Sequence, residues 1–65
     1  MMTTLTVEGM SCEHCEQSVA EALSDVEGVT EVSVDREGES ATVDGDADED
    51  ALVAAVEDAG YTAQA

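Results

Sequence analysis

The sequence contains no lysine, proline, isoleucine, phenylalanine or tryptophan. Its 65 residues include 17 acidic side chains, one Arg and one His, which gives a formal net charge of −16. A chain without a basic surface cannot displace counterions from phosphates, which excludes an unassisted nucleic-acid binder. The same deficit excludes a protein that is held on anionic membranes by its charge.

Long hydrophobic runs are also missing. No stretch of 18 apolar residues occurs, so no membrane span is predicted. The first four residues have neither a basic region nor an apolar region typical of a secretory signal. We therefore expect a cytoplasmic protein, in which thiols stay reduced. The length allows one domain, which we expect to occupy residues 1–65.

The apolar residues that are present are mostly small, with 10 Ala and 9 Val against 3 Leu. Such a core buries little area per residue and is marginal at this length. Low hydrophobicity with high charge is typical of disorder, but here the acids alternate with periodic apolar residues, which favours a fold. The acid-rich, lysine-free composition indicates an extreme halophile, because in molar salt the Debye length falls to about 3 Å and self-repulsion is screened.

Hydrophobic periodicity predicts six elements in the order β-α-β-β-α-β. A hairpin turn is expected over 36–39, with Gly38 at positive φ, and Ala59 is expected on the apolar stripe of the second helix. The order predicts the α+β class, as a ferredoxin-like sandwich whose four-stranded antiparallel sheet carries two helices on one face. The expected strands cover 3–8, 29–35, 40–44 and 61 to 63 or 65; the helices cover 12–24 and a segment from a cap at Asp46 or Asp48 to about Ala59.

The chemistry of the chain is concentrated between the first strand and the first helix. Cys12 and Cys15 form a C-x-x-C pair there, and Ser11 is expected to cap the helix. The free N–H groups and the positive dipole end of a helix N-terminus lower the pKa of nearby thiols, as a metal-binding or reactive thiol requires. Cys12 and Cys15 are therefore the predicted metal ligands.

Two thiolates suit a soft ion that accepts low coordination, which favours Cu(I). Zn(II) prefers four ligands and would find two missing, while Hg(II), Ag(I) and Cd(II) remain open. A thiol-disulfide oxidoreductase is the alternative from another class, although thioredoxin-like folds need a longer chain and usually a cis-proline. His14 is either an exposed residue or a third ligand that modulates metal release.

Gly9, Met10, Cys12 and Cys15 match the pattern G-M-x-C-x-x-C, and the scaffold beyond them matches too. On these residues the chain resembles the heavy-metal-associated domain family, the small copper chaperones and the N-terminal modules of P-type copper ATPases. The resemblance covers nearly the whole chain. The matching scaffold positions are Val19, Leu23, Gly28, Val29, Val32, Val34, Ala41, Val43, Leu52, Val56, Ala59, Gly60 and Tyr61.

The resemblance implies a non-enzymatic metallochaperone that holds solvent-accessible Cu(I) between Cys12 and Cys15. It also implies delivery to a P-type copper-transporting ATPase domain through a shared three-thiolate intermediate. We expect a monomer, or a dimer bridged by the metal. Met10 is expected to anchor the loop in the core. Tyr61 either closes the core beneath the loop or shields the thiolates with its hydroxyl.

The chain departs from the family pattern in its charges. Family chaperones often carry Lys or Arg near the metal loop, whereas this chain has Glu13 and Glu16, both expected to face water. The only Arg, Arg36, is expected in a hairpin distant from the loop. The acids raise the thiol pKa and the helix end lowers it, and we expect the helix end and the metal to prevail.

The proposed salt adaptation predicts that unfolding depends strongly on salt. We expect the urea midpoint of the metal-free chain to rise between dilute buffer and about 2 M KCl, because screening relieves repulsion among the acids. Circular dichroism at several KCl concentrations measures this shift. A metal-free chain that is as stable in dilute buffer as in molar KCl would contradict the salt-adaptation hypothesis.

Overall fold

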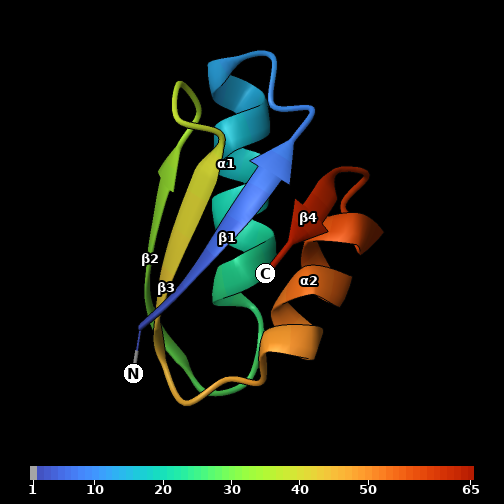
Figure 1. Cartoon of the computed structure of the whole chain (residues 1–65). Helices are drawn as coiled ribbons and strands as arrows, with labels where there is room; N and C mark the ends of the chain where they lie inside the picture. Colours follow the sequence, from blue (N-terminus) through green and yellow to red (C-terminus); the bar gives the residue numbers. More distant parts are fainter. Residues whose placement is uncertain (1) are drawn as a thin grey trace.

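Four strands and two helices follow one another in the predicted order (Figure 1). The computed structural model describes residues 2–65, so Met1, where the expected domain begins, lies outside the described residues. The elements are β1 (Met2–Glu8), α1 (Glu13–Ser24), β2 (Val29–Asp35), β3 (Ser40–Gly45), α2 (Glu49–Asp58) and β4 (Thr62–Gln64).

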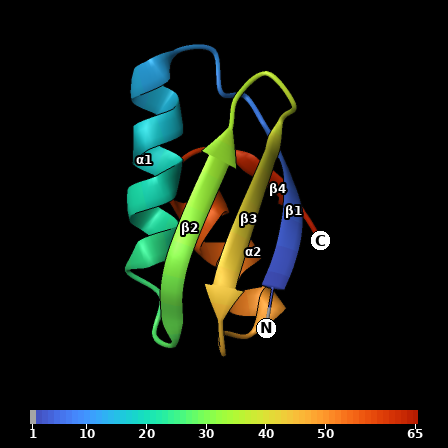
Figure 2. The same cartoon turned by 90° about the vertical axis from the view of Figure 1, so that its left-hand side faces the viewer.

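The four strands form one antiparallel sheet in the order β2-β3-β1-β4. Both helices lie on one face of this sheet, and Figure 2 shows the other face open toward the viewer. This arrangement confirms the predicted ferredoxin-like sandwich. Because β1, α1, β2 and β3 alternate in direction, the β1–α1 loop and the β2–β3 hairpin lie at the same end of the molecule (Figure 1).

The core lies between the sheet and the helices and follows the predicted periodicity. Val32 and Val34 are only half-buried, because β2 is an edge strand with a neighbour on one side. Ala59 is exposed, contrary to expectation, because it caps the C-terminus of α2 and the apolar stripe ends at Val56. The fully buried side chains come from β1, β3 and the two helices: Leu5, Val7, Ala41, Val19, Leu23, Leu52 and Val56.

The ends of α2 follow the predicted caps. Asp48 is the N-cap, and its Oδ1 accepts a hydrogen bond from the backbone N–H of Asp50 at 3.4 Å. Such a cap satisfies one of the free N–H groups of the first turn, and the negative charge suits the positive end of the helix. Of the two predicted caps, Asp46 and Asp48, the structure therefore selects Asp48.

The hairpin differs from the prediction at its glycine. The positive φ falls on Glu39, at 51°, and not on Gly38. The N–H of Glu39 bonds to the carbonyl of Arg36 at 3.2 Å, which closes a four-residue turn whose last residue is left-handed. This is a common way to connect two strands through a loop longer than two residues. The left-handed position therefore follows from the turn type.

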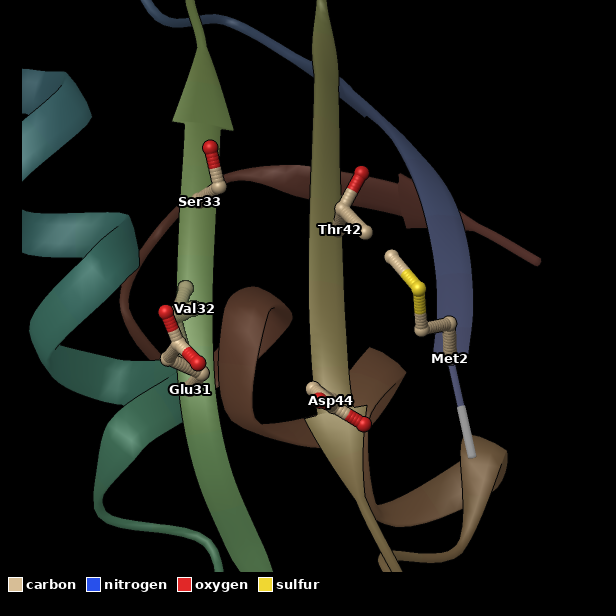
Figure 3. Close-up of a pocket in the computed structure, with 6 residues that line it drawn as sticks. All are labelled: Met2, Glu31, Val32, Ser33, Thr42 and Asp44. Atoms are coloured by element: carbon tan, nitrogen blue, oxygen red, sulfur yellow. The ribbon is translucent and has the colours of Figure 1, made fainter.

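The open face of the sheet carries polar side chains and a shallow hollow near the start of β1, shown in Figure 3. Asp44 on β3 lies opposite both Met2 on β1 and Glu31 on β2. Like charges opposite one another in a sheet are destabilising, so this pair supports a dependence on salt. The hollow is lined by Met2, Glu31, Val32, Ser33, Thr42 and Asp44.

Within residues 2–65, no helix is both long and apolar enough to cross a membrane.

Gly45, the last residue of β3, is predicted to tolerate no side chain. Its φ is 136°, and an added Cβ would collide with the backbone oxygen of Gly28 and lie 2.9 Å from the backbone nitrogen of Thr30. Neither backbone group can move aside freely. We expect Gly45→Ala to lower the free energy of unfolding by about 3 kcal/mol in urea titrations at fixed high salt.

Gly60→Ala is the matched control. Gly60 also has a positive φ, 99°, but an added Cβ there would meet no atom within 4 Å. This variant should lose only the cost of a left-handed backbone, about 1 kcal/mol. Equal losses in the two variants would contradict the predicted collision at Gly45.

Candidate metal site

The loop between β1 and α1 is anchored in the core by Met10. Its side chain is only 9% exposed and belongs to the same cluster of buried residues as Val7 and Val19. This confirms the predicted anchor. The thioether is therefore packed in the interior, and the polar part of the loop is left at the surface.

Cys12 and Cys15 lie together at the start of α1. Cys12 is the N-cap residue and is exposed, whereas Cys15 sits in the first turn and is half-buried. Both are free cysteines, and their Sγ atoms are 3.2 Å apart. The fold therefore brings the two predicted ligands into direct contact at the surface.

Ser11 does not cap the helix as expected. The N-cap is Cys12, in an extended conformation (φ −153°, ψ 169°), and it makes no side-chain cap hydrogen bond. The Oγ of Ser11 lies instead 3.9 Å from the Sγ of Cys15. The first turn of α1 thus begins with its thiols beside free backbone N–H groups, without the oxygen that usually satisfies one of them.

The pKa of Cys15 is lowered from 9.0 to about 6 by hydrogen bonds to its sulfur. The largest contribution comes from the hydroxyl of Tyr61, followed by the Cys12 thiol and the backbone N–H of Ser11, while burial acts in the opposite direction. Hydrogen bonds donated to the charged form favour it, so Cys15 is mainly a thiolate at neutral pH. Since the folded pKa is depressed, this group's contribution to stability is full above pH 9 and is lost as pH falls through about 6.

Tyr61 packs against the core, as predicted, and it also lowers the pKa of Cys15. Its ring packs against the core and lies beside the metal loop, since a Cβ added at Gly9 would lie 3.6 Å from Cδ1 of the ring. Hydrogen bonding to Cys15, together with burial, raises the pKa of Tyr61. Only the fold reveals this effect, because Tyr61 follows α2, whereas Cys12 and Cys15 lie at the start of α1.

Arg36 and Glu16 lie closer together than the sequence suggested. The backbone N–H of Arg36 donates to Oε2 of Glu16 at 2.9 Å. Glu16 is half-buried and does not simply face water, and the hairpin lies beside the first turn of α1 and is not distant from it. The reason is topological, since the hairpin and the metal loop share one end of the fold (Figure 1). Glu13 is exposed, as expected.

His14 is exposed in α1. Among residues 2–65, no group of three or more His, Cys, Asp or Glu side chains is placed to hold one ion. The structure therefore brings Cys12 and Cys15 together but does not assemble a third ligand with them. A pair of thiolates suits a soft ion of low coordination number and leaves a tetrahedral Zn(II) site two ligands short.

Comparison with known proteins decides the family. Residues 4–62 match the heavy-metal-associated domain. The chain belongs to the heavy-metal-associated domain family. It is 41% identical over 61 residues to the copper chaperone CopZ of Staphylococcus saprophyticus, and the match covers 89% of this chain and 90% of that protein.

Solved structures agree with this assignment. A CopZ metallochaperone superimposes with a TM-score of 0.93 at 36% identity, over 98% of this chain and all of that one (100%). A copper binding domain from HMA7, a P-type ATPase, superimposes with a TM-score of 0.94 at 35% identity, over 97% and 89% of the two chains. This heavy-metal-associated domain is thus similar both to a separate chaperone and to a domain of a transporter.

Tyr61→Phe should raise the pKa of Cys15 in this heavy-metal-associated domain, because it removes the largest cause of the shift. In the wild type, the alkylation rate of Cys15 should rise with pH through a midpoint near 6, as the thiolate forms. In Tyr61→Phe this midpoint should move upward. Iodoacetamide kinetics with peptide mass spectrometry report Cys15 separately from Cys12.

The control is Thr62→Ala, which changes the exposed residue next to Tyr61. It should leave the midpoint of Cys15 alkylation where it is in the wild type. An unchanged midpoint in Tyr61→Phe would show that the hydroxyl does not stabilise the thiolate.

Proposed function

We propose that this chain is a metallochaperone that binds one Cu(I) ion through Cys12 and Cys15. The observation that carries the proposal is the pair of free sulfurs 3.2 Å apart at the surface, one of them with a pKa lowered to about 6. Two thiolates and one Cu(I) match the preference of this ion for soft ligands and low coordination. Similarity to copper chaperones over most of the chain supports the choice of copper.

The two cysteines have different roles in this proposal. Cys15 is already a thiolate at neutral pH and receives a hydrogen bond from Tyr61, so it can bind the ion without first releasing a proton. Cys12 is exposed, so a thiolate of another protein can approach the ion beside it. The ion would pass on when the incoming thiolate binds as a third ligand and one of the original sulfurs then leaves.

We propose the metal-binding domain of a P-type copper-transporting ATPase as the recipient. The support is similarity in fold, since a domain of this kind in a P-type ATPase superimposes with a TM-score of 0.94. Donor and recipient would each hold the ion with two thiolates, so the ligands of the ion are of the same kind before and after the transfer. We place the exchange in a reducing cytoplasm, where both thiols stay free, and in a high-salt cell.

In this role the chain is a carrier and not an enzyme. The same sulfurs could form a disulfide, so a thiol-disulfide oxidoreductase is the competing function. Hg(II), Zn(II) and Cd(II) are competing cargoes, because each also binds thiolates. These alternatives differ in measurable ways from a Cu(I) carrier.

Cu(I) titration against a competing chelator, in dilute buffer and at about 2 M KCl, is the decisive experiment. We expect one Cu(I) per chain, and a loss of affinity of about 100-fold or more in Cys12→Ser and in Cys15→Ser, because each removes one of two ligands. Circular dichroism should show both variants folded at high salt, since Cys12 and Cys15 lie outside the fully buried core.

His14→Gln is the matched control, because it changes an exposed residue that lies between the two cysteines in the sequence. It should retain tight 1:1 binding. Tight Zn(II) binding with weak Cu(I) binding would contradict the proposed cargo. Turnover of a disulfide substrate that survives Cu(I) chelation would favour the oxidoreductase. Sedimentation with and without Cu(I) distinguishes a monomer from a metal-bridged dimer.

A further inference from the structure

The β2–β3 hairpin is bonded to both sides of the metal loop. On one side, the carbonyl of Glu39 accepts a hydrogen bond from the backbone N–H of Val7 at 2.8 Å, near the end of β1. On the other side, the backbone N–H of Arg36 donates to Oε2 of Glu16, in the first turn of α1, at 2.9 Å. The N–H of Glu39 bonds to the carbonyl of Arg36, so both attachments belong to one closed turn.

The two attachments differ in kind. The contact with β1 is a backbone bond that continues the β1–β3 ladder, which any sequence with this register would form. The contact with α1 depends on one side chain, that of Glu16. A carboxylate that accepts a backbone N–H makes a charge-assisted bond, which is stronger than a neutral one. Among the side-chain hydrogen bonds of residues 2–65, the bond between Arg36 and Glu16 is partly buried, whereas the others lie at exposed positions.

Met10 anchors the loop before α1 and Cys15 packs against the core, but the start of the helix itself lacks a side-chain cap. Its N-cap, Cys12, makes no side-chain cap bond, and the buried residues of the helix, Val19 and Leu23, lie one to two turns further along. Helix ends without a cap fray more readily than helix interiors. Glu16 follows Cys15 directly, so a bond that fixes Glu16 also fixes the turn that carries both sulfurs.

We propose that Glu16 is a positioning residue for the dithiol. Its carboxylate ties the first turn of α1 to the hairpin, and the hairpin is tied to β1, so the metal loop is held from both ends. The bond thereby maintains the approach of Cys12 and Cys15 before the ion arrives. This role rests on the proposed Cu(I) binding, and it acts through the position of the sulfurs and not through contact with the ion.

A purely electrostatic effect of Glu16 is the main alternative explanation. An acid in the first turn stabilises a helix through its dipole, and it also repels thiolates nearby. Glu13 lies in the same first turn and is exposed, and it accepts no hydrogen bond from the hairpin. The two glutamates therefore separate the effect of the bond from the effect of the charge.

The test compares Glu16→Ala, Glu16→Gln and Glu13→Ala at about 2 M KCl, where charge effects are screened. Glu16→Ala should make the Arg36 amide exchange hydrogen about tenfold faster or more, and should weaken Cu(I) binding by about fivefold, the effect of losing one hydrogen bond. Glu16→Gln keeps an acceptor oxygen and should restore most of both properties. Glu13→Ala should resemble the wild type in both.

Folding of each variant is checked by circular dichroism before titration. If Glu16→Ala does not fold, Glu16→Leu replaces it, because leucine keeps the aliphatic bulk and removes the acceptor. Chelator competition then measures Cu(I) affinity on the folded chain. A role confined to stability would lower the urea midpoint and leave Cu(I) affinity unchanged.

Four outcomes would overturn the proposal. Unchanged Cu(I) affinity in Glu16→Ala would show that the bond holds the hairpin but does not position the sulfurs. A Glu16→Gln variant as weak as Glu16→Ala, or an equal loss in Glu13→Ala, would assign the effect to charge. A wild type that binds no Cu(I) would overturn the proposed function together with this role. The other three outcomes, in a wild type that binds Cu(I), would overturn this role alone.

Discussion

A thiolate in a chain of net charge −16 is the physical constraint on which this site depends. Every nearby carboxylate repels the negative charge of the thiolate. Within the described residues, no basic side chain forms an ion pair with the sulfurs. Hydrogen bonding to the hydroxyl of Tyr61, the thiol of Cys12 and the backbone of Ser11 lowers the pKa of Cys15 instead. These bonds are short-range and dipolar, so salt screens them much less than it screens the surrounding charges.

The site lies where three connecting segments of the chain meet. The junction of the β1–α1 loop with α1 supplies the cysteines, and the α2–β4 connection supplies Tyr61. The hairpin supports the first turn of α1 through Glu16. Each connection comes from a different part of the chain (Figure 1). The alternating direction of the elements in this fold brings all three to one end, and the hollow on the open face lies near the other end of β1 (Figure 3).

The acidic surface and the small core both limit the stability of the fold. A core whose largest fully buried side chains are leucines and valines contributes limited hydrophobic energy, while acids such as Glu31 and Asp44 lie opposite each other on the sheet. Screening by salt reduces the second effect and leaves the first in place. The net charge therefore affects how stability depends on salt, whereas the chemistry of the site depends on a few neutral hydrogen-bond donors.

The sequence alone determined the order of the elements and most of their bounds, and it picked out the two cysteines that we propose as ligands. Periodicity of two and of 3.6 residues is local, and Asp48 and the C-x-x-C pair are read from neighbouring residues. Only the tertiary structure decided that Tyr61 lowers the pKa of Cys15, that the Glu16 carboxylate accepts a hydrogen bond from the Arg36 N–H, and that Cys12, not Ser11, occupies the N-cap. These contacts join residues far apart in the chain, or depend on the angle at which β1 enters α1, and no local pattern contains that information.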